Sequence, residues 1–262
     1  MKSLEAVFDW PSLAAQLKPL PGLVIAYSGG VDSAVLVHAA RRCLGKSRVL
    51  AVLADSPSLA REEKSEALKV AAELDVDLLL LQTEEIRNPR YRQNQGDRCF
   101  WCKEALFLAA EIPALERDWP VAYGEQADDD RDDRPGSRSA AGRGVLAPLR
   151  AAGWGKESIR AYARLQRLSI AEKPAAPCLA SRIVEGVPVS LQALSKVELL
   201  EKALRTRGYQ IFRARFLGEG QTRFEFQASE LPRALAEREG LARLAEQAGF
   251  PSLEIRAYAR PS

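Results

Sequence analysis

Runs of apolar residues alternate with amphipathic segments through the first two thirds of the chain. Short, almost uninterrupted apolar runs occupy residues 23–26 and 48–54, as is typical of strands buried on both faces of a parallel sheet, and a further strand is expected at 76–81. Helical spacing of apolar residues predicts helices at about 32–43 and 60–74. Because strand, helix and strand repeat in this order, the connections should be right-handed crossovers. The pattern therefore predicts an α/β fold with a doubly wound parallel sheet.

The middle of the chain continues this pattern less regularly. We expect a helix at about 101–111, a strand at 120–123 and a helix at 156–167, followed by a loop at 169–188. Residues 128–144 are rich in charge and glycine and predict a mobile loop over the site.

A different pattern begins near residue 190. Two segments alternate apolar and polar residues as half-buried strands do, and they are flanked by amphipathic helices. The expected elements are a helix at 190–207, strands at 209–216 and 222–227, a helix at 231–248 and a strand at 252–258. We therefore predict a small C-terminal α+β domain, with residues 1–188 as the first domain and 189–262 as the second.

Composition narrows the class of protein. Hydrophobic residues at 47% and charged residues at 28% are ordinary for a globular chain. The sequence has neither an apolar run of about 18 residues nor a signal-peptide pattern, so we expect a cytoplasmic protein without a membrane partner. The single histidine, His38, falls on a predicted helix, and histidine-based catalysis is therefore not expected.

Positive charge is concentrated in the middle of the chain, although the net charge of the whole chain is only +3. The basic residues of this region are Arg131, Arg134, Arg138, Arg143, Arg150, Lys156, Arg160, Arg164 and Arg167. They could attract a phosphate-bearing substrate or RNA, or they could form a solvated helix face.

The clearest motif is the stretch from Ser28 to Ser33, which joins a buried strand to a helix. Gly29 and Gly30 allow an anion to approach backbone amides, and a helix N-terminus favours negative charge. The motif resembles the SGGxDS loop of PP-loop ATP pyrophosphatases, which implies cleavage of ATP between the α and β phosphates. The other interpretation is an ordinary tight turn between strand and helix.

A second loop should lie beside the first. Asp55 and Ser56 end the next strand, and the carboxyl ends of parallel strands meet at one edge of the sheet. We expect Asp55, Ser56 and their neighbours to contact adenine or ribose; a plain turn is the alternative.

Three of the four cysteines carry candidate chemistry. Cys99 and Cys102 form a C-x-x-C pair at the start of a predicted helix, and Cys178 lies in an irregular stretch, whereas Cys43 fits a buried helix face. Three thiolates could hold a [4Fe–4S] cluster and leave one iron open for an extra sulfide. A zinc site, a redox pair with Cys178 as the resolving thiol, and unconnected thiols are the alternatives.

Several stretches together resemble the LarE family of ATP-dependent sulfur transferases over nearly the whole chain. They are Ala54 to Ser58, Asn88 to Tyr91, Asp97 to Lys103, Arg134 to Gly136 and Lys173 to Ile183. The resemblance implies adenylation of a carboxylate of pyridinium-3,5-biscarboxylic acid mononucleotide, followed by sulfur transfer that gives a thiocarboxylate in nickel-pincer cofactor biosynthesis. In single-cysteine members the residue matching Cys178 gives up its own sulfur, whereas three-cysteine members use a cluster that can be recharged.

The resemblance also implies roles for individual residues. Pyrophosphate would be held by Ser28, Gly29, Gly30, Asp32 and Ser33, with Asp32 also a ligand of Mg²⁺. Asp128 would bind metal or assist adenylation. The substrate would be bound by Trp101, Ser181, Arg182, Glu201, Arg213 and Arg215, of which the last two form an R-x-R pair suited to a phosphate, with a solvated strand face as the alternative.

Other functions remain open at this point. A tRNA thiolation enzyme also combines a PP-loop with cysteines, but the low net charge and the lack of a recognisable RNA-binding appendage argue against a nucleic-acid partner. An amide synthetase would have no use for the cysteines, and an iron–sulfur carrier would have no use for the loop. The sulfur source is undetermined, and the family resemblance implies a homo-oligomer.

Overall fold

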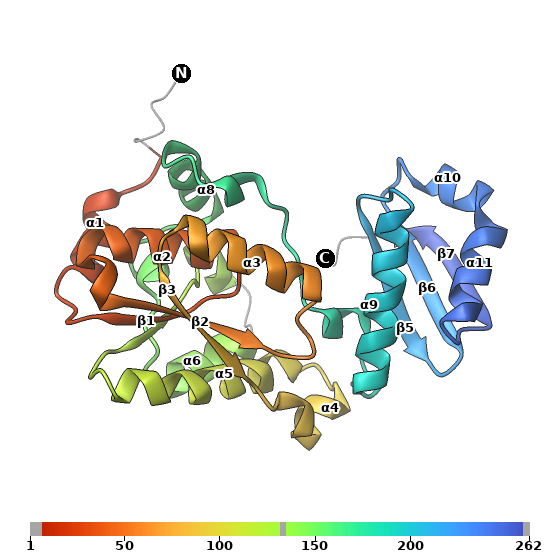
Figure 1. Ribbon diagram of the computed structural model, residues 1–262, viewed down its shortest axis with the longest axis horizontal. Coiled ribbons are helices and arrows are strands. Elements are labelled where there is room, and N and C mark those ends of the chain that lie inside the picture. The colour runs from red at the N-terminus through yellow and green to blue at the C-terminus, as the bar shows by residue number, and fades with distance from the viewer. Residues whose placement is uncertain (1–6, 132–134, 259–262) are drawn as a thin grey trace. The chain divides into compact units, whose positions relative to one another are not determined.

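The computed structural model describes residues 7–131 and 135–258, and its chain divides into two compact units (Figure 1). The first comprises Met1–Glu85 and Asp97–Ala176, and the second comprises Ile86–Gly96 and Pro177–Ser262. The later segment of the second unit thus begins twelve residues before the start expected at 189, and residues 86–96 also belong to this unit. Polar contacts with later elements of the unit explain the difference: Arg182 Nε donates to Glu201 Oε1 (2.8 Å), and the Val184 amide donates to the Phe216 carbonyl (3.1 Å). Segment 86–96 joins them because the Asn94 side-chain amide donates to the carbonyls of Val184 (2.8 Å) and Val187 (3.0 Å).

The first unit is built on a four-stranded parallel sheet with the order β3-β2-β1-β4. Its strands are β1 (Leu23–Ala26), β2 (Val49–Asp55), β3 (Asp77–Gln82) and β4 (Val121–Tyr123). Its helices are α1 (Trp10–Leu17), α2 (Val31–Leu44), α3 (Arg61–Glu73), α5 (Arg98–Leu115), α6 (Pro135–Gly142), α7 (Pro148–Ala151) and α8 (Lys156–Leu165). The predicted parallel α/β sheet is confirmed.

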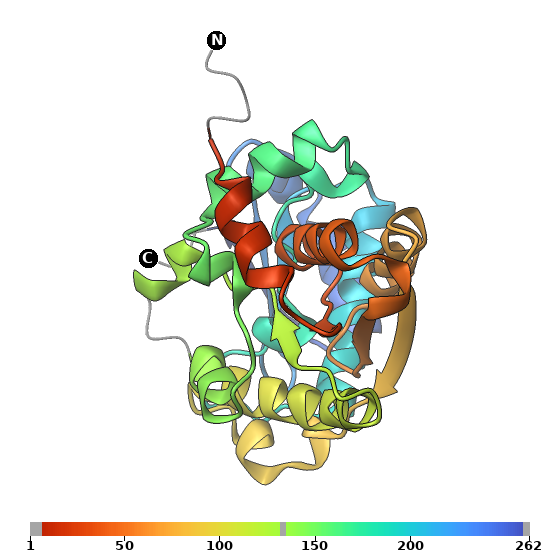
Figure 2. The ribbon, with the colours of Figure 1, turned by 90° about the vertical axis from the view of Figure 1, so that its left-hand side faces the viewer.

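Side chains alternate between the two faces of this sheet. Leu23 and Ile25 pack into a core with α1, α2, α3 and α8, whereas Val24 and Ala26 pack against α5 and α6. Figures 1 and 2 show these helical layers on opposite faces. Because helices cover both faces, β1 and β2 consist of consecutive apolar residues, as the sequence pattern indicated, whereas the edge strand β3 is largely exposed despite its apolar run.

The strand order places a topological switch between β1 and β4. From β1 the chain proceeds to β2 and then β3 on one side, and β4 pairs with the other side of β1. Ligands of doubly wound sheets bind in the crevice outside the carboxyl ends of the strands that flank such a switch. The loops that follow β1 and β4 are therefore the expected place for a ligand.

The prediction of a loop at 128–144 is wrong for much of its length. Ala127–Arg131 is a 3₁₀ turn and Pro135–Gly142 is helix α6, while residues 132–134 lie outside the described chain. Two side chains tie this region to α5: Ser139 Oγ donates to Glu104 Oε2 (2.7 Å), and Arg143 Nη1 donates to Glu111 Oε1 (2.6 Å). The charge-rich composition suggested a mobile loop, because the partners of these side chains are distant in sequence and could not be identified from it.

The second unit contains a three-stranded sheet with the order β5-β6-β7. β5 and β6 are antiparallel, and β6 and β7 are parallel. Its elements are α4 (Pro89–Gln93), α9 (Leu191–Thr206), β5 (Phe212–Gly218), β6 (Gln221–Phe226), α10 (Leu231–Ala236), α11 (Arg238–Gln247) and β7 (Ser252–Ala257). The single helix expected at 231–248 is two helices, because the backbone at Glu237 leaves helical geometry (φ −88°, ψ 11°).

The two faces of this smaller sheet differ in chemistry. Ala214, Phe224 and Phe226 are fully buried against α9, α10 and α11, whereas the arginines of β5 occupy the opposite face. The expected α+β arrangement is therefore present. In the part of the chain that the structure describes, no helix has both the length and the apolar character needed to cross a membrane.

Candidate active site

The loop between β1 and α2 is closed by its own serines. Ser33 Oγ donates to the Gly30 carbonyl (3.0 Å) and accepts from the Ser28 amide (3.2 Å), while Ser28 Oγ lies 3.1 Å from Ser33 Oγ. Gly29 has φ +73°, in the left-handed region that favours glycine. The two serines therefore hold the shape of the loop at the helix N-terminus, in addition to lining the space in front of it.

Two glycines permit the close packing of this loop. A Cβ on Gly29 would lie 2.5 Å from the Ala67 Cβ, and one on Gly124 would lie 2.8 Å from the Ser33 amide nitrogen. Gly124 follows β4 directly and was not among the predicted site residues. Its position after a buried strand was the available signal, but the pairing of β4 with β1 could not be derived from the sequence.

A cavity of about 380 Å³ opens between these two loops. Its described lining includes four basic and two acidic side chains, which gives a formal charge of +2. These are Lys103, Lys156, Arg160, Lys173, Asp32 and Glu63. The cavity is positively charged, lies at a helix N-terminus and is lined by the loop that resembles the SGGxDS motif. These features suit the binding of a polyphosphate.

Some of the basic residues from the middle of the chain line this cavity. Of the nine basic residues, Lys156 and Arg160, from the first turns of α8, line the cavity, as the phosphate interpretation requires, whereas Arg164 pairs with Glu172 on the surface, as the solvated-face alternative requires. Lys103 also lines it and lies 4.5 Å from the ring centroid of Tyr123. None of the four basic residues was among the predicted site residues, because each comes from an element whose place depends on the fold.

Asp32 lines the cavity, whereas Asp128 does not. Asp32 is in the first turn of α2 and lines the cavity, where its carboxylate oxygens are suitable for Mg²⁺. Asp128 Oδ2 accepts from the Lys156 amide (2.7 Å) at the start of α8, and Asp128 is not among the lining residues. In this structure Asp128 therefore caps the helix that carries Lys156 and Arg160.

The side chains of Asp55 and Ser56 are held by residues of α3, β3 and the turn after β3. Asp55 accepts from Arg61 (2.6 Å), Lys64 (2.5 Å) and Gln82 (3.0 Å). Burial alone would raise the pKa of Asp55, but the hydrogen bonds from Lys64 and Arg61 prevail and lower it to about 2. Ser56 Oγ donates to Glu85, and neither Asp55 nor Ser56 is among the residues that line the cavity.

Cys99 and Cys102 occupy the first turns of α5. They are three residues apart on one helix, so they share a face; Cys99 is exposed and Cys102 is partly buried. Trp101 Nε1 donates to Asp97 Oδ2 (2.7 Å), which ties the indole to the residue that precedes the helix. This turn belongs to the first unit.

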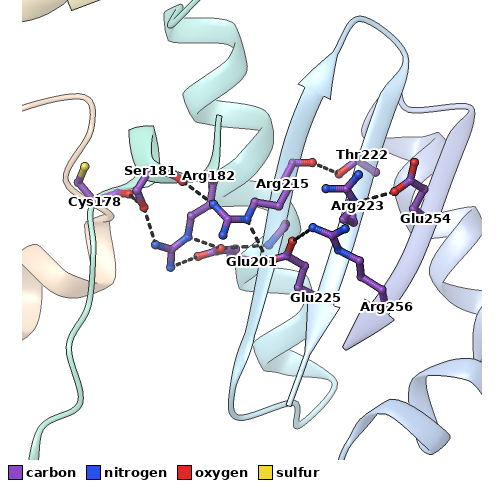
Figure 3. Close-up of polar contacts among 11 residues, drawn as sticks. Cys178, Ser181, Arg182, Glu201, Arg215, Thr222, Arg223, Glu225, Glu254 and Arg256 are labelled. Carbon is purple, nitrogen blue, oxygen red and sulfur yellow. Dashed lines mark hydrogen bonds and ion pairs between the residues drawn. The ribbon is translucent and has the colours of Figure 1, made fainter. Parts of the chain in front are cut away.

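Cys178 belongs to the second unit and begins a tight turn, drawn in Figure 3. The thiol is exposed. Both the Ser181 amide (3.0 Å) and Ser181 Oγ (2.7 Å) donate to the Cys178 carbonyl. Arg182 Nη1 donates to the Pro177 carbonyl (2.9 Å). The backbone on both sides of the thiol is therefore fixed by side chains of the same segment.

Arg182 is itself held by Glu201 on α9. Its Nε donates to Glu201 Oε1 (2.8 Å) and its Nη2 to Oε2 (3.3 Å), and both residues are buried (Figure 3). Glu201 Oε1 also accepts from the Ala214 amide (3.2 Å), which connects this pair to β5. The predicted residues Ser181, Arg182 and Glu201 are thus brought together, around the turn that carries Cys178.

The two arginines of β5 have different surroundings. Arg215 Nη1 donates to the Ser181 carbonyl (2.7 Å), and its Nε donates to Glu225 Oε2 (3.0 Å) (Figure 3). Arg213 stacks over Tyr258, with its guanidinium carbon 4.5 Å from the ring centroid, and burial lowers its pKa. Arg215 therefore joins the Cys178 turn to the charged face of the sheet, where Arg213 also lies.

Among residues 7–131 and 135–258, no three His, Cys, Asp or Glu side chains are grouped as a metal site. Cysteine thiolates are the usual ligands of iron–sulfur clusters, so the three thiols match such a cluster in donor type only; Cys99 and Cys102 belong to the first unit and Cys178 to the second.

Known proteins resemble this chain along most of its length. The family model for NAD synthase matches residues 8–99, which include the loop and β1 to β3. The chain is 38% identical over 193 residues to the uncharacterized protein slr1717 of Synechocystis, covering 73% of this chain and 72% of that protein. It is 29% identical over 206 residues to pyridinium-3,5-bisthiocarboxylic acid mononucleotide synthase of Lactiplantibacillus plantarum, covering 78% and 75%. The chain belongs to the LarE family of PP-loop enzymes.

The chain is also 28% identical over 185 residues to the uncharacterized protein MJ0830 of Methanocaldococcus jannaschii, a match that covers 70% of this chain and 69% of that protein. The LarE-family chain is accordingly an ATP-dependent enzyme, a sulfur transferase.

Proposed function

We propose that this LarE-family enzyme adenylates a carboxylate of pyridinium-3,5-biscarboxylic acid mononucleotide and converts it to a thiocarboxylate in nickel-pincer cofactor biosynthesis. The named relative from Lactiplantibacillus plantarum is a synthase of the corresponding bisthiocarboxylic acid, and the match covers three quarters of both chains. The observation that carries the proposal is the basic cavity at the PP-loop, because its wall includes Lys173 to Ala176 and the chain continues from there to Cys178.

The first step would be adenylation. A substrate carboxylate oxygen attacks the α-phosphorus of ATP, the bond from that phosphorus to the bridging oxygen breaks, and pyrophosphate leaves with the electron pair. The product is an acyl adenylate. The amides and glycines of Ser28 to Ser33 would hold the departing pyrophosphate, Lys103, Lys156 and Arg160 would offset its charge, and Asp32 would hold Mg²⁺.

The second step would be sulfur transfer. A sulfur nucleophile at the sulfide level attacks the activated carbonyl carbon, and AMP leaves with the electrons of the carbon–oxygen bond. The thiocarboxylate remains. Cys178 follows Lys173 by five residues, and an extended chain of five residues spans at most about 18 Å. The covalent connection supports a role for the Cys178 turn close to the step that begins in the cavity.

We propose Cys99, Cys102 and Cys178 as the ligands of a [4Fe–4S] cluster, which when bound would offer an exchangeable sulfur at an open iron. The residues of the second unit would position the Cys178 thiol through Arg182 and Arg215. We keep Arg213 and Arg215 as the proposed ligands of the substrate phosphate, with Ser181, Arg182, Glu201 and Trp101 as further substrate contacts and Asp128, Asp55 and Ser56 as proposed contributors to adenylation and nucleotide binding.

The alternative within this family is a sacrificial route. The Cys178 thiolate would attack the acyl adenylate, AMP would leave, and a thioester would form. Removal of the Cys178 α-proton would then break the Cβ–S bond, leaving the thiocarboxylate and a dehydroalanine. The exposure of the Cys178 thiol is compatible with this route too.

We expect a homo-oligomer in the cytoplasm that acts on a small molecule. Mixing the anaerobic protein with Mg-ATP and the biscarboxylated mononucleotide, and measuring AMP, pyrophosphate and thiocarboxylate, tests the proposal. We expect AMP and pyrophosphate in equal amounts, dependent on the mononucleotide. ATP cleavage that depends instead on tRNA, with binding that weakens steeply as salt rises, would establish the tRNA thiolation alternative.

A further inference from the structure

The ammonium group of Lys173 is enclosed by three oxygen atoms within the first unit. Nζ lies 3.3 Å from the Gly29 carbonyl, 2.7 Å from Glu63 Oε2 and 2.9 Å from Glu66 Oε2. The side chain is only 9% exposed. Since an ammonium has three N–H donors, these three acceptors can satisfy all of them. Lys173 is therefore held in one place, with its charge directed at the backbone of the loop.

This contact fixes one peptide of the loop. The Gly29 carbonyl and the Gly30 amide belong to the same planar peptide unit, so they point in opposite directions. The Gly30 amide donates to Ser28 Oγ at 3.3 Å. Glycines on both sides of this peptide leave its rotation almost free of steric hindrance. Without an anchor, the carbonyl oxygen could rotate toward the cavity and face an anionic phosphate.

The local charge argues against Lys173 as a direct phosphate ligand. Lys173, Glu63 and Glu66 together carry a formal charge of −1. Burial lowers the pKa of Lys173, but the two carboxylates prevail and hold it above its usual value. Lys103, Lys156 and Arg160 also line the cavity and can supply positive charge for the phosphates.

We infer that Lys173 is a positioning residue for ATP cleavage: it fixes the Gly29–Gly30 peptide so that the carbonyl oxygen stays turned away from the pyrophosphate, while Glu63 and Glu66 hold its ammonium group in place. The inference rests on ATP use by the enzyme and not on the proposed carboxylated substrate. Binding of Mg²⁺-pyrophosphate, which needs no second substrate, therefore tests it separately.

The experiment is a double-mutant cycle between Lys173→Met and Glu66→Gln, read by calorimetric titration with Mg²⁺-pyrophosphate. Glu66 is not among the lining residues, so its removal acts through Lys173. We expect Lys173→Met to weaken binding about tenfold and Glu66→Gln about threefold, as loss of charge-assisted hydrogen bonds would do. Glu66→Gln should have no further effect once Lys173 is methionine. Lys46→Met, which removes a lysine paired with Asp75 away from the cavity, should leave binding unchanged.

A crystal structure of Lys173→Met completes the test, with a rotated Gly29–Gly30 peptide as the expected result. An unrotated peptide combined with unchanged pyrophosphate affinity would overturn the inference. Tighter binding by Glu66→Gln would also overturn it, because that result would make Lys173 a phosphate ligand restrained by Glu66. Since Glu66→Gln keeps the lysine, this arm remains informative even if Lys173→Met does not fold.

Discussion

At the scale of single residues, Glu201 has a clearer structural role than its sequence suggested. The sequence placed it among the substrate contacts, whereas in the structure its two carboxylate oxygens accept hydrogen bonds from Arg182 and from the Ala214 amide. Burying such an ion pair costs desolvation free energy. Removing only one partner destabilises the protein, because the other charge stays buried without its counter-charge. Its effect on Cys178 is indirect, through the Arg182 contact with Pro177.

We predict that Glu201→Gln lowers the free energy of unfolding by about 2–4 kcal/mol, because it leaves the buried Arg182 guanidinium without a charged partner. Urea unfolding of the variant and the wild type measures this loss. The double variant Arg182→Met/Glu201→Leu should recover much of the stability yet stay deficient in sulfur transfer. Full stability of Glu201→Gln would instead favour a role confined to substrate binding.

Asp55 gives a prediction for pH. Its folded pKa of about 2 lies below the unfolded value, so its contribution to stability is present above about pH 4 and is lost as the pH falls toward 2. Arg61 is half exposed, and solvent screening reduces the gain. Asp55→Asn should therefore cost about 1–2 kcal/mol at pH 7.

Chemical unfolding at a series of pH values tests this account of Asp55. The stability difference between Asp55→Asn and the wild type should narrow from pH 4 downward. A difference that stays constant across this range would show that the carboxylate charge is not its source.

At the scale of elements, the junctions of β1 with α2 and of β4 with its loop depend on close backbone contact. Gly124 contacts the first turn of α2 so closely that a Cβ would lie 2.9 Å from the Asp32 carbonyl carbon. Backbone atoms on both sides leave little room for adjustment. The position of the PP-loop relative to β4 is therefore sensitive to a single methyl group.

We predict that Gly124→Ala lowers stability by about 1–3 kcal/mol, as overpacking does, and reduces ATP cleavage at least tenfold because the loop must shift. Gly142→Ala is the matched control, since a Cβ there meets no atom within 4 Å. Unfolding and pyrophosphate release measure the two effects. Equal behaviour of the two alanine variants would contradict the packing argument.

The sequence predicted the individual strands better than it predicted which strands pair with one another. The apolar runs identified β1 and β2 because strands buried on both faces need consecutive apolar residues, and a third run identified β3, although that edge strand is largely exposed. The pairing of β4 with β1 could not be predicted, since it depends on tertiary contacts. For this reason the loop motif was recognised, whereas Lys173 and Gly124 emerged only with the fold.

At the scale of the whole molecule, the chemistry is distributed over two units. The first holds the loop, the basic cavity and the Cys99–Cys102 turn, and the second holds Cys178 and the arginines of β5. The expected boundary at 188 would have assigned Cys178 to the first domain, because contacts such as the pairing of Arg182 with Glu201 are not visible in composition. The account therefore assigns activation to the first unit and draws the proposed sulfur-delivering cysteines from both units.

The most direct test of this account is mass spectrometry of product and protein after anaerobic turnover with Mg-ATP, the biscarboxylated mononucleotide, iron and sulfide. We predict several thiocarboxylates per chain and an intact Cys178, with repeated turnover lost in Cys99→Ala. At most one thiocarboxylate per chain, accompanied by loss of hydrogen sulfide from Cys178, would contradict the rechargeable cysteine site and establish the sacrificial route.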